Sequence, residues 1–192
     1  MRELTLLPWS IGAFTVATAY NWSLPWLAEK GYTEKRPDGQ ESISEYVDNP
    51  HANAAFAMSL VPTIAVEWVD VALSKEVTML GVVALTLSQL GLTGVVAADV
   101  DYDPTTHAWS FVTLVVSLIV YSLIRTRSCV EARVRWPLYS LMAISAGLFV
   151  TLVYRYHTYP DERGPTFYRI ETAMLTALVA FTPVRLYLET RG

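Results

Sequence analysis

The sequence predicts an all-α membrane protein, a bundle of six transmembrane helices. Of the 192 residues, 53% are hydrophobic and only 17% are charged, whereas about a quarter of the residues in soluble domains are charged. The apolar residues come in long runs, and a run of about 20 mostly apolar residues can cross a bilayer. The runs are separated by polar segments too short to fold alone, so residues 1–192 are expected to form a single domain. The six predicted spans cover residues 4–26, 51–73, 77–98, 107–124, 136–154 and 167–187.

The first two spans enclose the one long polar loop, residues 28–49. Trp9, Trp22 and Trp26 in the first span are placed like the aromatic residues of membrane interfaces. The alternative for this segment is a cleaved signal peptide ending near residues 17–19, Ala-Thr-Ala. The second span contains Pro62 and ends at a tight polar turn.

The third span carries Gly81, Gly91 and Gly94, a spacing of small residues that predicts close helix packing in a bilayer. Gln89 in the same span is expected to make an interhelical hydrogen bond. An acid-rich turn then leads to His107, where the fourth span begins.

The last three spans are joined by two distinctive loops. An arginine-rich loop, RTRSCVEARVR, lies between the fourth and fifth spans. The loop YRYHTYPDERGPTFYR precedes the sixth span, which Pro183 interrupts near its end.

Six spans place both termini on the same side of the membrane. The loops on that side carry most of the basic residues, whereas the opposite side carries most of the acids. Short basic loops stay in the cytoplasm, so both termini are expected to be cytoplasmic. The turn after the third span and the loop with His157 are then expected to face the lumen or the exterior.

Several motifs carry a resemblance to a known family. Ile43-Ser44-Glu45, followed by Pro50 and then by Phe56 at the start of the second span, resembles the "ISD…P…F" element of the damage-regulated autophagy modulators. These proteins belong to the FRAG/DRAM/Sfk group of six-span membrane proteins.

The resemblance continues through the rest of the chain. Residues 94–99 (GVVAAD), followed by His107, look like the "G…VAN(F/Y)…H" turn of the group. Residues 160–164 (PDERG) are similar to its "PEDKG"-type loop, and residues 168–181 resemble its last span. The resemblance implies a DRAM-like role in lipid handling, in autophagy-linked (lysosomal) endomembranes or in plasma-membrane organisation.

The chain departs from the group at two places. Thr176 and Ala177 stand where the group has a glutamate and an aromatic residue, and Glu171 lies five residues earlier. Asp99 takes the place of the usual asparagine in the turn.

The candidate site lies at the face opposite the termini. His51, His107 and His157 start or follow spans there, close to Asp99 and Glu171. Neutral imidazoles and carboxylates can bind zinc and activate a water molecule, so a metal-dependent lipid hydrolase is one reading. A clasp between Asp99 and His107 is the favoured one, and such a clasp is sensitive to pH.

Two further sets of polar residues belong to the cytoplasmic side. Glu67 and Asp70 share one face of the second span, where ionisable groups are costly and often functional. Asp70 is expected to be solvated at the interface, and Glu67 is expected to pair with an arginine of the basic loop. The four arginines of that loop are expected to set topology, to contact anionic lipid headgroups, or both. They are Arg125, Arg127, Arg133 and Arg135.

Other classes of protein are excluded. The net charge of −4 argues against nucleic acid as a partner, and the single cysteine, Cys129, excludes an internal disulfide and a cysteine-based metal site. All three lysines lie in loops, so no retinal Schiff base forms within a span. The sequence has no GxSxG, P-loop or dinucleotide-binding motif.

The sequence therefore predicts a membrane protein without a cofactor or metal that binds lipid or a partner protein, and it leans against an enzyme. The alternatives are a metal-dependent lipid hydrolase or remodelling enzyme and an accessory subunit of a larger membrane complex.

Overall fold

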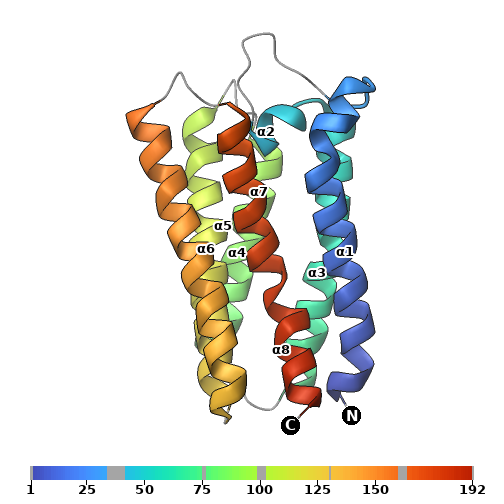
Figure 1. The fold of residues 1–192 in the computed structure, drawn as a ribbon, viewed down its shortest axis with the longest axis vertical. Helices are drawn as coiled ribbons and strands as arrows, with labels where there is room; N and C mark the ends of the chain where they lie inside the picture. Colours follow the sequence, from blue (N-terminus) through green and yellow to red (C-terminus); the bar gives the residue numbers. More distant parts are fainter. Residues whose placement is uncertain are drawn as a thin grey trace.

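The structure is a computed structural model that describes residues 2–33, 42–74, 77–98, 103–129, 131–159 and 164–191. Within these ranges the regular structure is entirely helical. The helices are α1 (Arg2–Glu29), α2 (Ile43–Tyr46), α3 (Pro50–Leu73), α4 (Met79–Ala97), α5 (Pro104–Ser128), α6 (Ala132–Thr158), α7 (Pro165–Val179) and α8 (Phe181–Thr190). Figure 1 shows the long helices side by side, with both termini at one end and α2 at the other. These are called the termini end and the α2 end.

All six apolar segments are helical, which confirms the all-α class. Four of the helices, α3 to α6, are long and apolar enough to cross a membrane. The chain is a membrane protein on this evidence, because a helix satisfies its own backbone hydrogen bonds inside hydrocarbon.

Short polar residues begin the helices at the α2 end. The Asn49 side chain accepts a hydrogen bond from the Ala52 amide (2.8 Å) at the start of α3. Asp103 does the same for the Thr106 amide (3.1 Å) at the start of α5. Hydrogen bonds from the Thr106 side chain and from this amide lower the pKa of the Asp103 carboxyl. A side chain that accepts from the first-turn amides satisfies donors that have no partner within the helix.

The sixth apolar segment is two helices rather than one. It breaks at Ala180, between α7 and α8. Pro183 is the cause, because proline lacks the amide that would bond the carbonyl four residues earlier, and its ring crowds that carbonyl.

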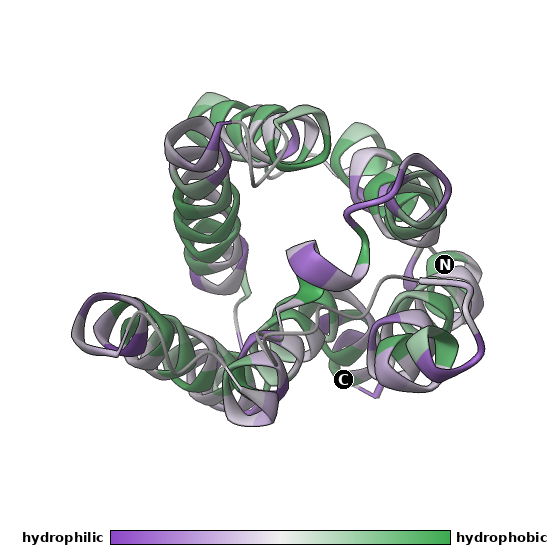
Figure 2. Ribbon diagram, turned by 90° about the horizontal axis from the view of Figure 1, so that it is seen from above, coloured by the Kyte–Doolittle hydropathy of each residue, from purple (hydrophilic) through white to green (hydrophobic). Residues whose placement is uncertain are grey.

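The long helices form a ring. α1 packs against α3 and against α7 and α8, α4 packs along α5, and α6 lies between α5 and α7. Figure 2, which looks along the bundle, shows a short helical turn inside this ring. It is α2, whose residues Ile43, Glu45 and Tyr46 are all buried.

Two glycines set the spacing of α4 and α5. A Cβ atom at Gly91 would lie only 2.5 Å from the Leu114 backbone nitrogen, and one at Gly94 would collide with the Ser110 side chain. The predicted close approach is confirmed at these positions, where only glycine lets the backbones meet. Gly81 leaves ordinary contact distances.

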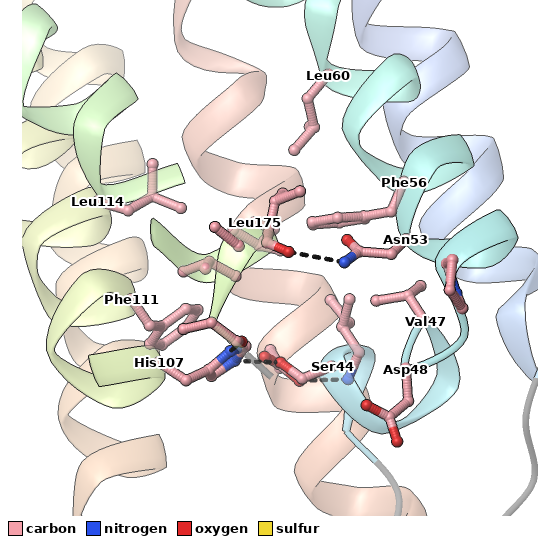
Figure 3. Close-up of a pocket in the computed structure, with 17 residues that line it drawn as sticks. Ser44, Val47, Asp48, Asn53, Phe56, Leu60, His107, Phe111, Leu114 and Leu175 are labelled. Atoms are coloured by element: carbon pink, nitrogen blue, oxygen red, sulfur yellow. Dashed lines mark hydrogen bonds between the residues drawn. The ribbon is translucent and has the colours of Figure 1, made fainter. Parts of the chain in front are cut away.

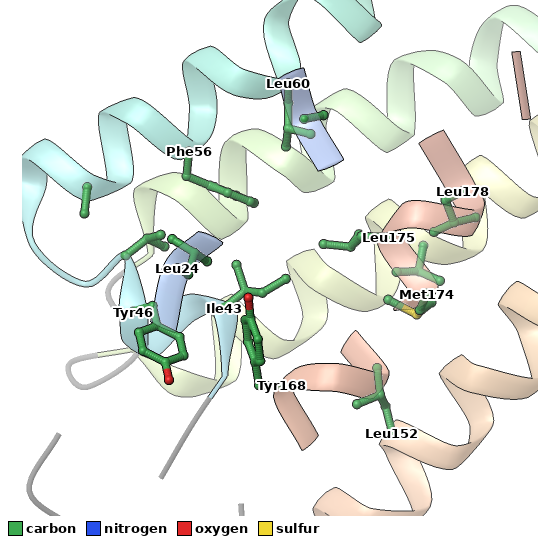
Figure 4. Packing of buried hydrophobic residues seen from close by; sticks show 14 residues of the cluster. Leu24, Ile43, Tyr46, Phe56, Leu60, Leu152, Tyr168, Met174, Leu175 and Leu178 are labelled. Atoms are coloured by element: carbon green, nitrogen blue, oxygen red, sulfur yellow. The ribbon is translucent and has the colours of Figure 1, made fainter. Parts of the chain in front are cut away.

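The largest apolar core lies beneath α2 (Figure 4). Ile43 and Tyr46 of α2 pack there against Leu24, Phe56 and Met174 from three long helices. Burying an aliphatic or aromatic side chain of this size stabilises the fold by about 1.5–3 kcal/mol. The packing therefore holds α2 in the mouth of the ring.

Candidate functional site

A cavity of about 240 Å³ lies directly beneath α2. Its walls come from α2 and the residues after it, from α3, from the end of α4, and from α5 and α7. The lining residues are Ile43, Ser44, Val47, Asp48, Pro50, Asn53, Phe56, Leu60, Val95, Val96, Ala97, Ala98, His107, Phe111, Leu114, Glu171 and Leu175. It is called the α2 cavity below.

The α2 cavity has a polar end and an apolar end. Figure 3 shows Ser44, Asp48 and His107 at one end, and Leu60 and Leu114 at the other. Ligand sites in proteins commonly have this composition, with mostly apolar walls and a few polar groups that orient the ligand.

His107 ties α5 to α2 and to the end of α4. Its Nδ1 lies 2.9 Å from the Ala98 carbonyl oxygen, and its Nε2 lies 2.7 Å from the Ser44 hydroxyl. A carbonyl can only accept, so Nδ1 carries a proton; in the neutral ring Nε2 then accepts from Ser44. His107 therefore links α5 to α2 and to the end of α4 through Ser44 and Ala98. Asp99 lies outside the described residues, and its pairing with His107 stays a prediction.

Glu171 anchors α2 from the opposite wall. Its Oε2 accepts a hydrogen bond from the Ile43 amide (2.7 Å), and the residue is only 6% exposed. Nearby, the Tyr168 ring packs edge-on against Tyr46, with 5.2 Å between ring centroids, and its hydroxyl donates to the Asn21 carbonyl. The position of α2 is therefore fixed by buried polar contacts as well as by apolar packing.

Asn53 joins α3 to α4 at the side of the cavity. Its amide nitrogen donates to the Val96 carbonyl (2.8 Å). Apart from this region, α3 and α4 pack only sparsely against each other, because α3 packs mainly against α1 and α4 against α5.

The three histidines that the zinc alternative would require do not come together. His51 and His157 are exposed, His157 stacks edge-on against Tyr156, and only His107 lines the cavity. Among the described residues, no group of three His, Cys, Asp or Glu side chains is placed to hold a metal ion. The zinc-site hypothesis thus has no ligand set in the described part of the chain.

A second polar site lies toward the termini end, two helical turns below the cavity. Glu67 follows Leu60 by seven residues on α3, and Tyr121 follows Leu114 by seven on α5. Seven residues are about two turns, or about 10 Å along a helix. The two sites therefore lie on the same inner faces of these helices.

The centre of this second site is a buried carboxylate, Asp70. Its Oδ2 accepts from Arg125 Nη2 (2.8 Å) and from Arg185 Nη2 (2.6 Å). All three side chains are almost completely buried, with 0%, 3% and 1% exposed. The expectation that Asp70 is solvated at the interface is wrong, because α5 and α8 cover it and supply its counter-charges.

The other acid of this site, Glu67, accepts a hydrogen bond from the Thr182 hydroxyl through Oε1. Its Oε2 is buried and has no hydrogen-bond partner among the described residues. Of the loop arginines considered as partners of Glu67, Arg125 bonds to Asp70 instead. Thr182 could not be predicted as a partner from the sequence, because it lies 115 residues away on α8. Glu67, Asp70, Arg125, Thr182 and Arg185 are called the Asp70 cluster.

Glu189 closes the Asp70 cluster toward the termini end. Its carboxylate accepts two hydrogen bonds from Arg185 Nη1 (2.9 and 3.1 Å). The Cys129 thiol donates to the same carboxylate (3.5 Å). Burial, followed by the negative charge of Glu189, raises the pKa of Cys129 to about 11.

Two further expectations are changed by the structure. Arg125 is buried in its ion pair, so the expected headgroup contact does not fit it. Arg127 and Arg133 are exposed and Arg135 is half-buried, so for these three the contact stays a prediction. The Gln89 amide nitrogen is buried but has no hydrogen-bond partner in the described part of the chain, so the interhelical bond expected of it is not found.

The chain matches no protein-family model, and comparisons with curated proteins and with solved structures give no match either. The functional argument therefore rests on the chemistry of the two sites.

Proposed function

We propose that this chain is a non-enzymatic six-span membrane protein of the FRAG/DRAM/Sfk type whose α2 cavity binds one amphipathic, lipid-like molecule. The observation that carries this proposal is the gradient of polarity in the cavity. Ser44 and His107 lie at the polar end beside α2, and Phe56, Leu60 and Leu114 line the apolar part. A molecule with a polar head and an apolar chain matches this gradient.

The lengths of the remaining helices support six spans. α1 has 28 residues, about 42 Å at 1.5 Å per residue, and α7 with α8 covers Pro165–Thr190. Both exceed the hydrocarbon thickness of about 30 Å. Of the charged groups of α8, Arg185 is buried in an ion pair with Asp70 of α3, and Glu189 pairs with Arg185. The common end of both termini in Figure 1 also fits an even number of spans.

The proposed orientation places the termini end in the cytoplasm. Arg127, Arg133 and Arg135 lie at that end, where short basic loops favour the cytoplasmic side. Their charge there attracts anionic headgroups. The α2 cavity then opens on the lumenal or external face of an endomembrane or of the plasma membrane.

The sparse packing between α3 and α4 provides a route by which the apolar chain of a lipid enters the cavity from the bilayer. Both helices line the cavity, through Phe56 and Leu60 on one side and Val95 and Val96 on the other. A lipid therefore needs to bury only part of its length, which agrees with a cavity of about 240 Å³.

The test is to fill the cavity and measure retained lipid. Leu175 lines the cavity, so Leu175→Trp takes up its space. Val150 on α6 is 65% exposed, so Val150→Trp is a matched control on the outer face. Native mass spectrometry should show one bound lipid on the wild type and the control but not on Leu175→Trp. Equal retention by all three proteins contradicts the proposal.

A further inference from the structure

The neutral polar side chains of the α2 cavity use their hydrogen-bond donors within the protein. The Ser44 hydroxyl donates to His107 Nε2 (2.7 Å), and His107 Nδ1 donates to the Ala98 carbonyl (2.9 Å). The Asn53 amide nitrogen donates to the Val96 carbonyl (2.8 Å). These side chains line the cavity from α2, α5 and α3. What they offer to a ligand is therefore mainly acceptor capacity.

Two neutral oxygens carry this acceptor capacity. The Ser44 hydroxyl oxygen has lone pairs that its bond to His107 does not use, and the Asn53 amide oxygen is separate from the nitrogen that donates to Val96. Figure 3 shows both side chains among those that surround the cavity. The end of α4 also lines the cavity, through residues 95–98, and the carbonyl groups at a helix C-terminus carry partial negative charge. A hydrogen-bond donor on the ligand matches these surroundings.

The charged heads of common lipids fit the cavity less well than an uncharged head. None of the described lining residues is a lysine or an arginine, so a phosphate finds no cation among them. Asp48 and Glu171 lie at the polar end, but both already take part in interactions within the chain, among them the bond from the Ile43 amide to Glu171. A charged head loses hydration in a partly buried site, and only a well-placed counter-charge offsets that cost. An uncharged head avoids the cost.

We infer that the α2 cavity binds an uncharged lipid whose head is a hydroxyl group, the chemistry of long-chain alcohols and of acylglycerols with a free hydroxyl. This inference rests on the function proposed above and specifies the ligand of that site. A hydroxyl group has one donor, which the Ser44 or the Asn53 oxygen accepts. It adds no charge to the polar end of the cavity.

The apolar chain of such a lipid follows the face of α3 that lines the cavity. Asn53, Phe56 and Leu60 lie on this face, and about 10 Å of helix separates the first from the last. The hydroxyl head therefore lies beside Asn53 while the chain contacts Phe56 and Leu60. Phe111 and Leu114 of α5 add further apolar wall. The chain then leaves the cavity between α3 and α4, where the two helices pack sparsely.

The experiment uses the full chain in a neutral detergent and four probes that share one dodecyl chain: dodecanol, dodecyl methyl ether, dodecylamine and dodecyl phosphate. Native mass spectrometry measures the binding of each probe. Dodecanol should bind at least about fivefold more tightly than the methyl ether, which accepts a hydrogen bond but donates none. Dodecanol should also bind more tightly than the two charged probes. Equal or tighter binding of any of the other three probes overturns the inference.

Variants test whether the two oxygens bind the hydroxyl group. Asn53→Leu removes the amide oxygen from the cavity wall, and Ser44→Ala removes the hydroxyl oxygen. Either change should lower the ratio of dodecanol affinity to methyl ether affinity at least about threefold, whereas a merely structural defect would weaken both probes alike. Thr151→Val is the matched control, because Thr151 lies on the exposed face of α6, and it should leave the ratio unchanged. An unchanged ratio in both Asn53→Leu and Ser44→Ala overturns the inference.

The design separates the two proposals. Leu175→Trp should abolish the binding of dodecanol and of the methyl ether; if it changes neither, the function proposed for the cavity fails as well. Leu60→Trp fills the cavity from α3 and replaces it if Leu175→Trp does not fold, as judged by circular dichroism. Binding that the filled cavity abolishes but that favours the methyl ether or a charged probe leaves the cavity function intact and overturns the hydroxyl head alone.

Discussion

Replacing Asp70 with Asn should destabilise the bundle strongly. The substitution leaves the shape of the side chain but removes the charge that two buried arginines share. Breaking a buried ion pair by removing one partner costs about 3–5 kcal/mol, because the other charge stays buried without compensation. The loss falls mainly on Arg125, which also donates to the neutral Ser74 hydroxyl (3.1 Å). Arg185 keeps the Glu189 carboxylate at 2.9 Å.

The measurement is unfolding by denaturing detergent, followed by circular dichroism. Asp70→Asn should lower the free energy of unfolding by about 3–5 kcal/mol. Adding Arg125→Met should recover more of this loss than adding Arg185→Met, since Arg185 retains a counter-charge. Arg133→Gln is the control, because Arg133 pairs with Glu131 at the exposed surface and such pairs contribute about 1 kcal/mol or less.

Two results would refute this reasoning. One is a loss below about 1 kcal/mol for Asp70→Asn, which is the size expected of an exposed pair. The other is a further loss on adding Arg125→Met, which would show that Arg125 does not depend on Asp70 for its counter-charge.

Three further predictions concern the helix packing, the thiol and the start of α5. Gly91→Ala should lower the free energy of unfolding by about 1–3 kcal/mol, because the added methyl group forces α4 away from α5. Gly147 has open space around it, so Gly147→Ala should be neutral or raise the free energy of unfolding by about 0.5–1 kcal/mol. Equal effects of the two substitutions on stability would contradict the close packing at Gly91. The Cys129 thiol, with its pKa raised to about 11, should react slowly with maleimide at neutral pH. Glu189→Gln should speed this reaction, because it removes the negative charge that helps to raise the pKa. An unchanged rate would exclude the Glu189 carboxylate as a cause of the raised pKa. Hydrogen bonds from the Thr106 side chain and amide lower the folded pKa of Asp103 below the ordinary 3.8. Their contribution to stability is therefore present above that value and is lost as the pH falls through the lowered pKa. The difference in melting temperature between wild type and Asp103→Ala should shrink in acid, and a constant difference down to about pH 2 would argue against these bonds.

The long helices could be predicted from the sequence because each must satisfy its own backbone within a bilayer. That requirement needs a long apolar run, and such runs are visible without knowing which helices touch. The break at Ala180 was signalled by Pro183 for the same local reason. The close packing of α4 on α5 was likewise predictable from a local feature, the small residues Gly91 and Gly94.

The site was only partly predictable, because its contacts join distant segments. His107 and Glu171 were expected to belong together, and both line the α2 cavity. The helix α2 itself was missed, although Ser42 three residues before Glu45 is a helix-start signature, and the Ser42 side chain does accept from the Glu45 amide (3.2 Å). Four residues are too few for periodicity to show.

The burial of Asp70 could not be predicted from the sequence. Its distance from the end of a predicted span favoured a solvated position. Its partners Arg125 and Arg185 lie 55 and 115 residues away, and only the packing of α5 and α8 against α3 brings them together. The assignment of arginines to lipid or to ion pairs therefore depends on tertiary contacts.

The central claim is that the α2 cavity holds the chain of an amphipathic molecule. Its most direct test is photocrosslinking with a lipid analogue that carries a diazirine in its apolar chain, followed by peptide mapping. We expect saturable labelling at Phe56, Leu60, Phe111, Leu114 or Leu175, suppressed by an excess of the same lipid without the diazirine. Labelling confined to outward-facing positions such as Ile144 and Val150 of α6, with no competition, would contradict it.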